Sequence, residues 1–340
     1  MPERVDAACG ASGPSAEAAW AESEIRNVRG ARWSLASVQP VASRMARVFR
    51  LVVTDGTQRS GYYLKQFSAE GIDDLGLHLQ RLKAVSTALQ RVPGITPYIV
   101  IGYDLERRLL LTQEMSGESI LNIQHRVNRR LGVGAAELID AWRGVGLLLR
   151  SLHRALPPQT SSLHAAQLGQ YTSERFNAWT AVDRTYRTLG RQALETIETV
   201  IRLVGHEPVT LVPCHGDVSG YNILVDRTVG LVDFDDLRFD LPGLDISQSL
   251  LDIKHSSRIA SLIPLPGIIR GSTDALLTGY DDHIIGGPRF WLPHLRNLSV
   301  FLLTLSRRRK GFGPSRLSDE LHYRQTIREL ENTLIAVAQA

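Results

Sequence analysis

The chain has 340 residues, of which 43% are hydrophobic and 22% are charged, a composition typical of an ordinary globular protein. These values exclude a collagen, a coiled-coil rod and a fully disordered chain, and the length is enough for about two domains. Lys and Arg number 39 and Asp and Glu 35, so the formal net charge is only +4. So small an excess does not argue for nucleic-acid binding.

The small number of cysteines and the short apolar runs bear on the cellular compartment of the protein. Cys9 and Cys214 are too few for a disulfide framework, which favours a reducing environment. The longest apolar run, Leu298–Leu305, is far shorter than the roughly 18 residues that a membrane helix needs. The N-terminus lacks the apolar core of a signal peptide. We therefore expect a cytoplasmic protein without a transmembrane segment.

The first third of the chain has the pattern of an antiparallel sheet with one helix. Residues 1–24 are rich in Ala, Gly, Ser, Pro and Glu, which predicts a disordered tail. The hairpin signal Asp55-Gly56 separates two β-rich runs. The predicted elements are strands Trp33–Val38, Arg47–Thr54 and Gly61–Phe67, helix Ile72–Gln90, and strands Tyr98–Tyr103 and Arg108–Thr112. Residues 25–115 are thus expected to form an N-terminal lobe.

From residue 116 onward the chain is mostly helical. Apolar stripes at helical spacing predict a helix over Ala135–Ala155 and one long helical stretch over residues 173–204. Further helical patterns cover residues 244–253, 274–280, 292–306 and 318–338. A β-rich lobe followed by a helical lobe at residues 116–340 predicts a bilobal α+β fold with its functional cleft at the junction.

The most informative stretch lies between residues 214 and 236. It has the sequence CHGDVSGYNIL, followed at residue 230 by GLVDFDD. Residues 223–232 have the pattern of a small hairpin, which would bring Asn222 and Asp233 side by side. An amide and a carboxylate bind a hard cation through oxygen, while Asp217 would remain available for proton transfer. Phosphoryl transfer needs this combination of groups.

The pattern His215-Gly216-Asp217-x-x-x-x-Asn222, with Val232-Asp233-Phe234, resembles the aminoglycoside phosphotransferase and choline kinase family. That family has a protein-kinase-like fold. The resemblance implies an ATP- and Mg²⁺-dependent phosphotransferase that moves the γ-phosphate to a hydroxyl of a small molecule. It covers most of the chain from about Arg32 and is most specific at the catalytic loop.

The resemblance also implies roles for the acidic and amide side chains. Asp217 would be the catalytic base or would orient the acceptor hydroxyl. Asn222 and Asp233 would hold magnesium, and Asp235 would be a ligand at a second metal site. His215 would support the loop.

Other matches concern the scaffold of the helical lobe. Asp245 corresponds to an aspartate that anchors the catalytic loop from a following helix. Leu152-His153 matches a pair that often ends the first long helix of the second lobe. Gly279-Tyr280 resembles a Gly-Tyr pair found further along the family's sequences.

Nucleotide binding is assigned in the same way. Lys65, on the third strand, would pair with the nucleotide phosphates, and the backbone of Gln113 and Met115 would meet adenine. The loop between the first two strands has no glycine, so Ser43 and nearby amides would cover the phosphates.

The acid that should pair with Lys65 is absent from the middle of the following helix. The acids there lie near its start, and either Glu70 or Asp74 would substitute.

Two other functions remain open. A pseudokinase would use the same fold as a binding module, and a glycosyltransferase would use Asp233-Phe234-Asp235 as a DxD motif. A protein kinase is disfavoured because no Ala-Pro-Glu motif follows and the segment between Asp233 and Asp245 is short. The acceptor could be a sugar, an amino alcohol, an antibiotic or a glycan precursor.

A basic run, Arg307–Lys310, follows the apolar helix. Its charge would complement the helix dipole at that end. The alternative is a docking patch for an anionic substrate or for a membrane surface.

Overall fold

The computed structural model describes residues 15–41, 46–68, 72, 74–205, 208–259, 265–280, 284–309 and 316–340. The chain divides into two compact units. The first consists of Met1–Lys83 and Tyr98–Glu114, and the second of Ala84–Pro97 and Met115–Ala340. Within the described residues, none of the helices is both long and apolar enough to span a membrane.

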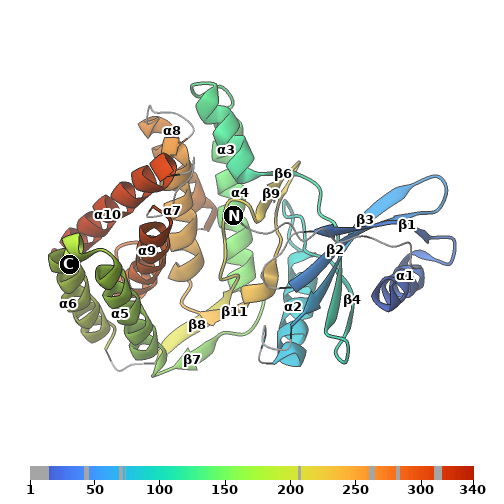
Figure 1. The fold of residues 1–340 in the computed structure, drawn as a ribbon, viewed down its shortest axis with the longest axis horizontal. Coiled ribbons are helices and arrows are strands. Elements are labelled where there is room, and N and C mark those ends of the chain that lie inside the picture. Colours follow the sequence, from blue (N-terminus) through green and yellow to red (C-terminus); the bar gives the residue numbers. More distant parts are fainter. Residues whose placement is uncertain are drawn as a thin grey trace. The chain divides into compact units, whose positions relative to one another are not determined.

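The first unit contains a five-stranded antiparallel sheet in the order β1-β2-β3-β5-β4 (Figure 1). Its strands are β1 (Ser34–Val41), β2 (Ala46–Thr54), β3 (Arg59–Phe67), β4 (Val100–Asp104) and β5 (Leu109–Gln113). The predicted hairpin is confirmed, since Thr54 pairs with Arg59. At its turn, Asp55 Oδ1 accepts the amides of Thr57 and Gln58 at 2.9 and 2.8 Å.

A helix begins inside the segment whose composition predicts a tail. Helix α1 (Ala16–Arg29) starts at Ser15, whose hydroxyl accepts the amide of Ala18. Ala21 and Ile25, four residues apart, are buried in one cluster with sheet residues such as Leu51. The helix therefore depends on contacts with the sheet, which its Ala-rich sequence does not signal.

Helix α2 (Leu75–Leu89) is the predicted helix of the N-terminal region. Its start is capped by Asp74, whose Oδ1 accepts the amide of Leu77 at 2.9 Å. One of the two acids considered as partners of Lys65 therefore serves as a helix cap.

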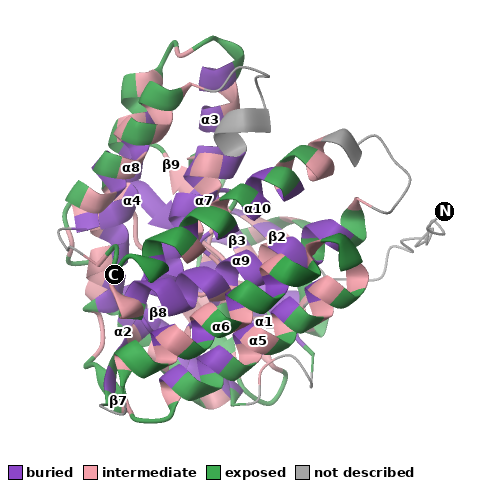
Figure 2. Cartoon of the chain, turned by 90° about the vertical axis from the view of Figure 1, so that its left-hand side faces the viewer, coloured by how far each residue is buried: buried purple, intermediate pink, exposed green. Residues whose placement is uncertain are grey.

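The second unit is mostly helical, as expected. Its helices are α3 (Ile120–Arg129), α4 (Ala135–His153), α5 (His164–Val182), α6 (Arg187–Val204), α7 (Gly243–Ile259), α8 (Pro266–Tyr280), α9 (Pro288–Arg308) and α10 (Arg316–Ala338). Exposed and buried residues alternate along α5 and α6 in Figure 2, whereas α9 has many buried residues.

The prediction of one helical stretch over residues 173–204 is wrong, because the chain breaks between α5 and α6. A 3₁₀ turn at Arg184–Tyr186 follows Asp183. The carboxylate of Asp183 accepts the hydroxyl of Tyr323 at 2.7 Å and forms an ion pair with Arg309. Both partners lie more than a hundred residues away, so a periodicity within the stretch does not reveal the break.

Two small sheets in this unit support the central loop. One has the order β10-β9-β6 and the other β11-β8-β7. Their strands are β6 (Glu118–Ser119), β7 (Gln159–Ser161), β8 (Val209–Cys214), β9 (Ile223–Val225), β10 (Val229–Leu231) and β11 (Arg238–Asp240). The loop 215–222 connects β8 to β9 and so joins the two sheets.

Helices α4 and α8 approach each other closely through glycines. A Cβ at Gly146 would collide with the backbone carbonyl of Leu276, and one at Gly279 with that of Arg143. Backbone on both sides leaves little room for adjustment, so this pair of helices requires glycine at both positions.

We expect Gly146→Ala to lower the free energy of unfolding by roughly 1–3 kcal/mol, because the added methyl group forces the two backbones apart. Chemical denaturation measures this change. Gly267→Ala, also in α8, is the matched control: nothing lies within 4 Å of its new Cβ. It should stabilise the protein by about 0.4–1 kcal/mol. Equal effects of the two variants would contradict the close-packing argument.

Candidate active site

The predicted hairpin forms and brings two of the predicted metal ligands to one end. Strands β9 and β10 pair antiparallel, and the carbonyl of Asn222 accepts the amide of Val232 at 3.0 Å. Asn222 therefore lies just before the hairpin and Asp233 just after it. Asp233 has φ 67° and ψ 59°, a left-handed conformation that is uncommon outside glycine and that clusters at functional sites.

Asp217 is held by one hydrogen bond on each carboxylate oxygen. The side-chain nitrogen of Asn222, Nδ2, donates to Oδ2 of Asp217 at 3.1 Å and to the backbone carbonyl of Asp217 at 3.0 Å. Gln248 Nε2 donates to Oδ1 at 2.9 Å. Since a carboxylate has about four acceptor sites, each oxygen can accept a further hydrogen bond.

The contacts of Asn222 also leave its side-chain oxygen, Oδ1, available to a cation. Its side-chain nitrogen is engaged by Asp217, and no partner of Oδ1 appears among the described residues. Asp235 lies in the short 3₁₀ turn Phe234–Asp236, directly after Asp233. An amide oxygen with nearby carboxylates is a set of hard donors suited to Mg²⁺.

Gln248 is a candidate site residue that the sequence analysis missed. It lies in α7 and bridges the loop, because its Oε1 accepts the amide of Val218 at 3.1 Å while its Nε2 donates to Asp217. The available signal was spacing: Gln248 is three residues beyond Asp245 and so on the same face of a helix.

Asp245 lies at the start of α7 and contacts the loop backbone. Its Oδ2 accepts the amide of His215 at 2.8 Å and its Oδ1 that of Gly216 at 3.0 Å. His153 Nε2 lies 3.2 Å from Oδ2. Burial alone would raise the pKa of Asp245, but the hydrogen bond and charge of His153, with His215 and the Gly216 amide, lower it. The contacts are those expected of a loop anchor.

His215 is fully buried and makes the contacts of a supporting residue. Its Nε2 donates to the carbonyl of Val232 at 3.0 Å, and its Nδ1 accepts the amide of Asp217 at 3.3 Å. Its ring meets that of Phe234 edge-on at 4.5 Å. It thus links the loop to the strand that precedes Asp233.

Asp252 is a second residue that the sequence analysis missed. Its Oδ2 accepts the amide of Gly220 at 2.5 Å. Burial raises its pKa to about 7, the Gly220 amide opposes this rise, and the charge of Asp217 adds to it. Carboxyl groups with shifted pKa values are enriched at functional sites, so Asp252 is a further candidate residue of this site.

A cavity of about 520 Å³ opens beside Asp217, entirely within the second unit. Its walls come from α3, the loop, α7, α9 and α10. Apolar side chains on it include Leu121, Val300 and Phe301, and polar ones include His125, Asp252 and His322. A larger hollow of about 660 Å³ between α6 and α10 contains none of the predicted site residues.

The basic run at the end of α9 is divided between two environments. Arg308 lines the cavity beside Asp217. Arg309 instead forms ion pairs with Asp183 and Glu320. Lys310 lies outside the described residues.

The predicted nucleotide-binding residues of the first unit lie on or beside its sheet. Lys65 is in β3, opposite Val48 and Leu110, with 9% of its surface exposed. Gln113 ends β5, and its amide already donates to the carbonyl of Ile99 at 2.9 Å. Only the Gln113 carbonyl therefore remains for an adenine contact.

The other predicted residues on the nucleotide side are placed differently. Met115 belongs to the second unit and packs against Gly230. The neighbouring Glu114, which the sequence analysis did not consider, accepts both Arg50 nitrogens at 2.8 and 2.9 Å. Ser43 and Glu70 lie outside the described residues.

We expect the stability of Asp252→Asn, relative to wild type, to increase as pH rises. The folded carboxyl has its pKa raised to about 7 from an unfolded value near 3.9, so the folded state binds an extra proton between these values. Wild-type stability therefore falls as pH rises through this window, while asparagine stays neutral. Urea denaturation at pH 4.5 and 8 should show the variant's advantage growing by on the order of 3 kcal/mol.

The exposed residue Asp274 provides the control, because Asp274→Asn should show the same difference from wild type at both pH values. A constant difference for Asp252→Asn would contradict the raised pKa.

Solved structures similar to this chain include small-molecule kinases. A glucosamine kinase matches with a TM-score of 0.61 and 15% identity, over 93% of this chain and 82% of that one. An amicoumacin kinase, solved with AMP-PNP, Ca²⁺ and amicoumacin, matches with 0.53 and 13%, over 87% and 88%. A choline kinase from Cryptosporidium parvum matches with 0.50 and 11%, over 89% and 88%. At such identities these likenesses establish the fold.

Among curated protein sequences, none matches significantly. The family model described as "Phosphotransferase enzyme family" matches residues 37–278, which include most of the sheet of the first unit, the loop 215–222 and helix α7. The match extends over more than half of the chain. The chain therefore belongs to this phosphotransferase family and has its protein-kinase-like fold.

Proposed function

We propose that this protein transfers the γ-phosphate of ATP to a hydroxyl group of a small molecule with the help of Mg²⁺. The observation that supports this most directly is the arrangement around Asp217. Its carboxylate is oriented by Asn222 and Gln248 and borders a cavity of about 520 Å³. The cavity is of a size that accommodates a small molecule.

In this proposal Asp217 is the catalytic base. The acceptor hydroxyl donates a hydrogen bond to the carboxylate, which orients an oxygen lone pair toward the γ-phosphorus. The bond from that oxygen to phosphorus forms as the bond to the ADP oxygen breaks. The hydroxyl proton passes to Asp217 late in the step, as expected for a loose transition state.

Asn222, Asp233 and Asp235 are the residues that would hold magnesium. Bound magnesium would neutralise charge on the phosphate oxygens. The left-handed backbone at Asp233 and the engaged nitrogen of Asn222 both favour presentation of oxygen donors. Lys65 would neutralise phosphate charge from β3.

The cavity is the proposed acceptor site. Its apolar wall, together with hydroxyl, amide, imidazole, carboxylate and guanidinium groups, suits a hydroxyl-bearing molecule with an apolar face. A screen of ATP consumption over hydroxylated metabolites and antibiotics would identify the acceptor.

We expect Asp233→Asn to weaken Mg²⁺-dependent ATP binding by roughly tenfold or more, since one ligand loses its charge without changing size. Titration calorimetry with ATP, with and without Mg²⁺, measures this. Asp226→Asn, an exposed change in the turn of the same hairpin, should leave the affinity unchanged. If wild type binds no ATP under either condition, the kinase proposal is wrong.

We expect Asp217→Asn to lower turnover by roughly 10²- to 10⁴-fold, because asparagine keeps the shape of the side chain but cannot accept the proton. ATP affinity should change little, since Asp217 contacts the acceptor. Turnover with an identified acceptor and calorimetry with ATP together test this. A loss of tenfold or less, or an equal collapse of ATP affinity, would contradict the assigned role.

A further inference from the structure

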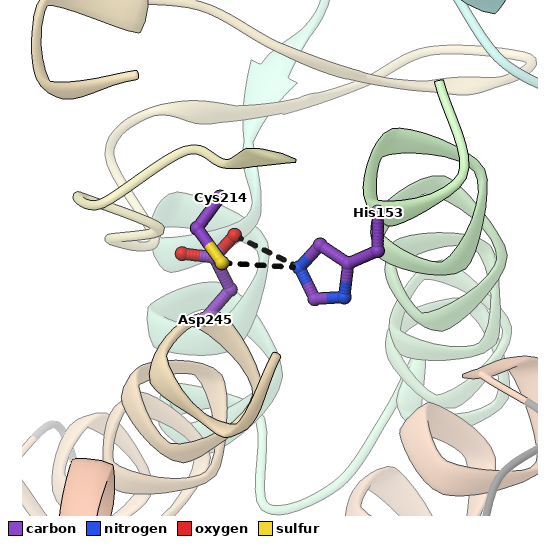
Figure 3. A group of neighbouring side chains, drawn as sticks. All are labelled: His153, Cys214 and Asp245. Carbon is purple, nitrogen blue, oxygen red and sulfur yellow. Dashed lines mark hydrogen bonds and ion pairs between the residues drawn. The ribbon is translucent and has the colours of Figure 1, made fainter. Parts of the chain in front are cut away.

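A chain of buried hydrogen bonds leads from the loop to the end of helix α8. Asp245 accepts the loop amides of His215 and Gly216, and its Oδ2 lies 3.2 Å from His153 Nε2 (Figure 3). On the opposite side of that ring, Nδ1 lies 2.8 Å from the hydroxyl of Tyr280. His153 and Tyr280 are each 5% exposed, so water does not substitute readily for either bond.

The positions of the protons in this hydrogen-bonded series follow from the ionisation of Asp245. Burial raises the pKa of Asp245, but the interactions that oppose burial, led by the hydrogen bond from His153 and including the Gly216 amide, lower it overall. The ionised carboxylate has no proton to donate, so the hydrogen between it and Nε2 belongs to His153. In the neutral ring this hydrogen leaves a lone pair on Nδ1 that accepts the hydroxyl of Tyr280, whereas in the charged ring Nδ1 would donate to it; the NMR test below distinguishes the two.

We propose that Tyr280 is a positioning residue: its hydroxyl donates to Nδ1 of His153 and thereby fixes the ring orientation and tautomer with which His153 holds Asp245 and, through it, the catalytic loop. The kinetic part of this inference depends on the proposed function. The spectroscopic part does not.

The packing of α4 against α8 supports this role. His153 is the last residue of α4 and Tyr280 the last of α8. The glycine contacts at Gly146 and Gly279 bring the two helix backbones together. The rings of His153 and Tyr280 meet edge-on, with their centroids 5.5 Å apart. The packing of the two helices thus fixes the position of the Tyr280 hydroxyl.

A metal ion is the competing explanation for the group. His153, Cys214 and Asp245 offer ligand atoms within 4.8 Å of one another. The Sγ atom of Cys214 lies 3.9 Å from His153 Nε2 (Figure 3), but it also lies 3.7 and 3.6 Å from the carbonyls of Asp240 and Leu241, to which the thiol donates. Without a metal, burial and the charges of Asp245 and Asp240 raise the pKa of the thiol well above its ordinary value, so the thiol keeps its proton in the hydrogen-bonded arrangement. The hydrogen-bonded arrangement is complete without an ion.

The first test is nitrogen-15 NMR of the histidine rings in wild type and Tyr280→Phe. Wild-type His153 should show a protonated Nε2 and a hydrogen-bonded, unprotonated Nδ1. The variant should shift the Nδ1 resonance and speed hydrogen exchange at the amides of His215 and Gly216. Tyr323→Phe removes another buried hydroxyl, which bonds Trp179 and Asp183. It is the control: it should change stability without altering these signals.

The second test uses turnover. Tyr280→Phe should lower kcat by about tenfold, taking as a guide the low end of the loss caused by removing the hydrogen-bond partner that orients a metal-binding histidine. The KM for ATP should stay within twofold, which general unfolding would not produce. The His153→Gln variant keeps a side-chain N–H that can donate to Asp245, and this donor does not depend on a hydrogen bond from Tyr280. In the His153→Gln background, Tyr280→Phe should therefore have no further effect on kcat.

Three results would overturn the inference. The first is an unchanged His153 Nδ1 signal in Tyr280→Phe. The second is an equal kcat loss from that change in the His153→Gln background, which would mean that Tyr280 acts through packing. The third is one equivalent of zinc bound by the wild-type protein and lost in Cys214→Ser. A protein without turnover would refute the proposed function, while the NMR result would still decide the role of Tyr280.

Discussion

The carboxylate of Asp245 is the constraint on which the central loop depends. An ionised group in a fully buried position is costly unless hydrogen bonds replace its water. Here the replacements are two loop amides and the ring of His153. Because the amides belong to His215 and Gly216, satisfying the carboxylate also determines the path of the backbone that leads to Asp217. Gly216 follows this path at φ +85°, and a Cβ there would lie 2.7 Å from the carbonyl of Asp236.

Helix α7 extends this control along the whole loop. Asp245, Gln248 and Asp252 recur at three and then four residues, so they share one face of the helix. Their side chains accept the amides of Gly216, Val218 and Gly220, every second residue of the loop. Gln248 also orients Asp217. One helix face thus holds both the backbone and the proposed base, which is the rigid support that a positioned reactive group needs.

The two arginines at the end of α9 show how one helical step changes a residue's environment. Successive residues on a helix point about 100° apart. Arg309 therefore turns inward to Asp183 and Glu320, while Arg308 borders the cavity. The sequence interpretation treated the run as one unit, either a charge complement to the helix dipole or a docking patch. The structure gives two of its members different places: Arg309 links α9 to other helices, and Arg308 lies at the proposed acceptor site.

The sequence by itself determined the class of fold and the position of the reactive loop. Alternating β-rich runs and helical stripes are local patterns, and the motif from His215 to Asn222 with Asp233 is a local spacing; each is readable without neighbours. The five-stranded sheet, the helical second unit and the hairpin between Asn222 and Asp233 follow from them.

Only the tertiary structure decided which distant residues support that loop. Gln248 and Asp252 look like ordinary polar positions of a helix until the loop lies on them, and the break at Asp183 arises from Tyr323 and Arg309. The link from Tyr280 to His153 spans 127 residues and exists because α4 and α8 meet at glycines. Such contacts depend on side-chain direction and close packing between segments, and no single stretch of sequence encodes them.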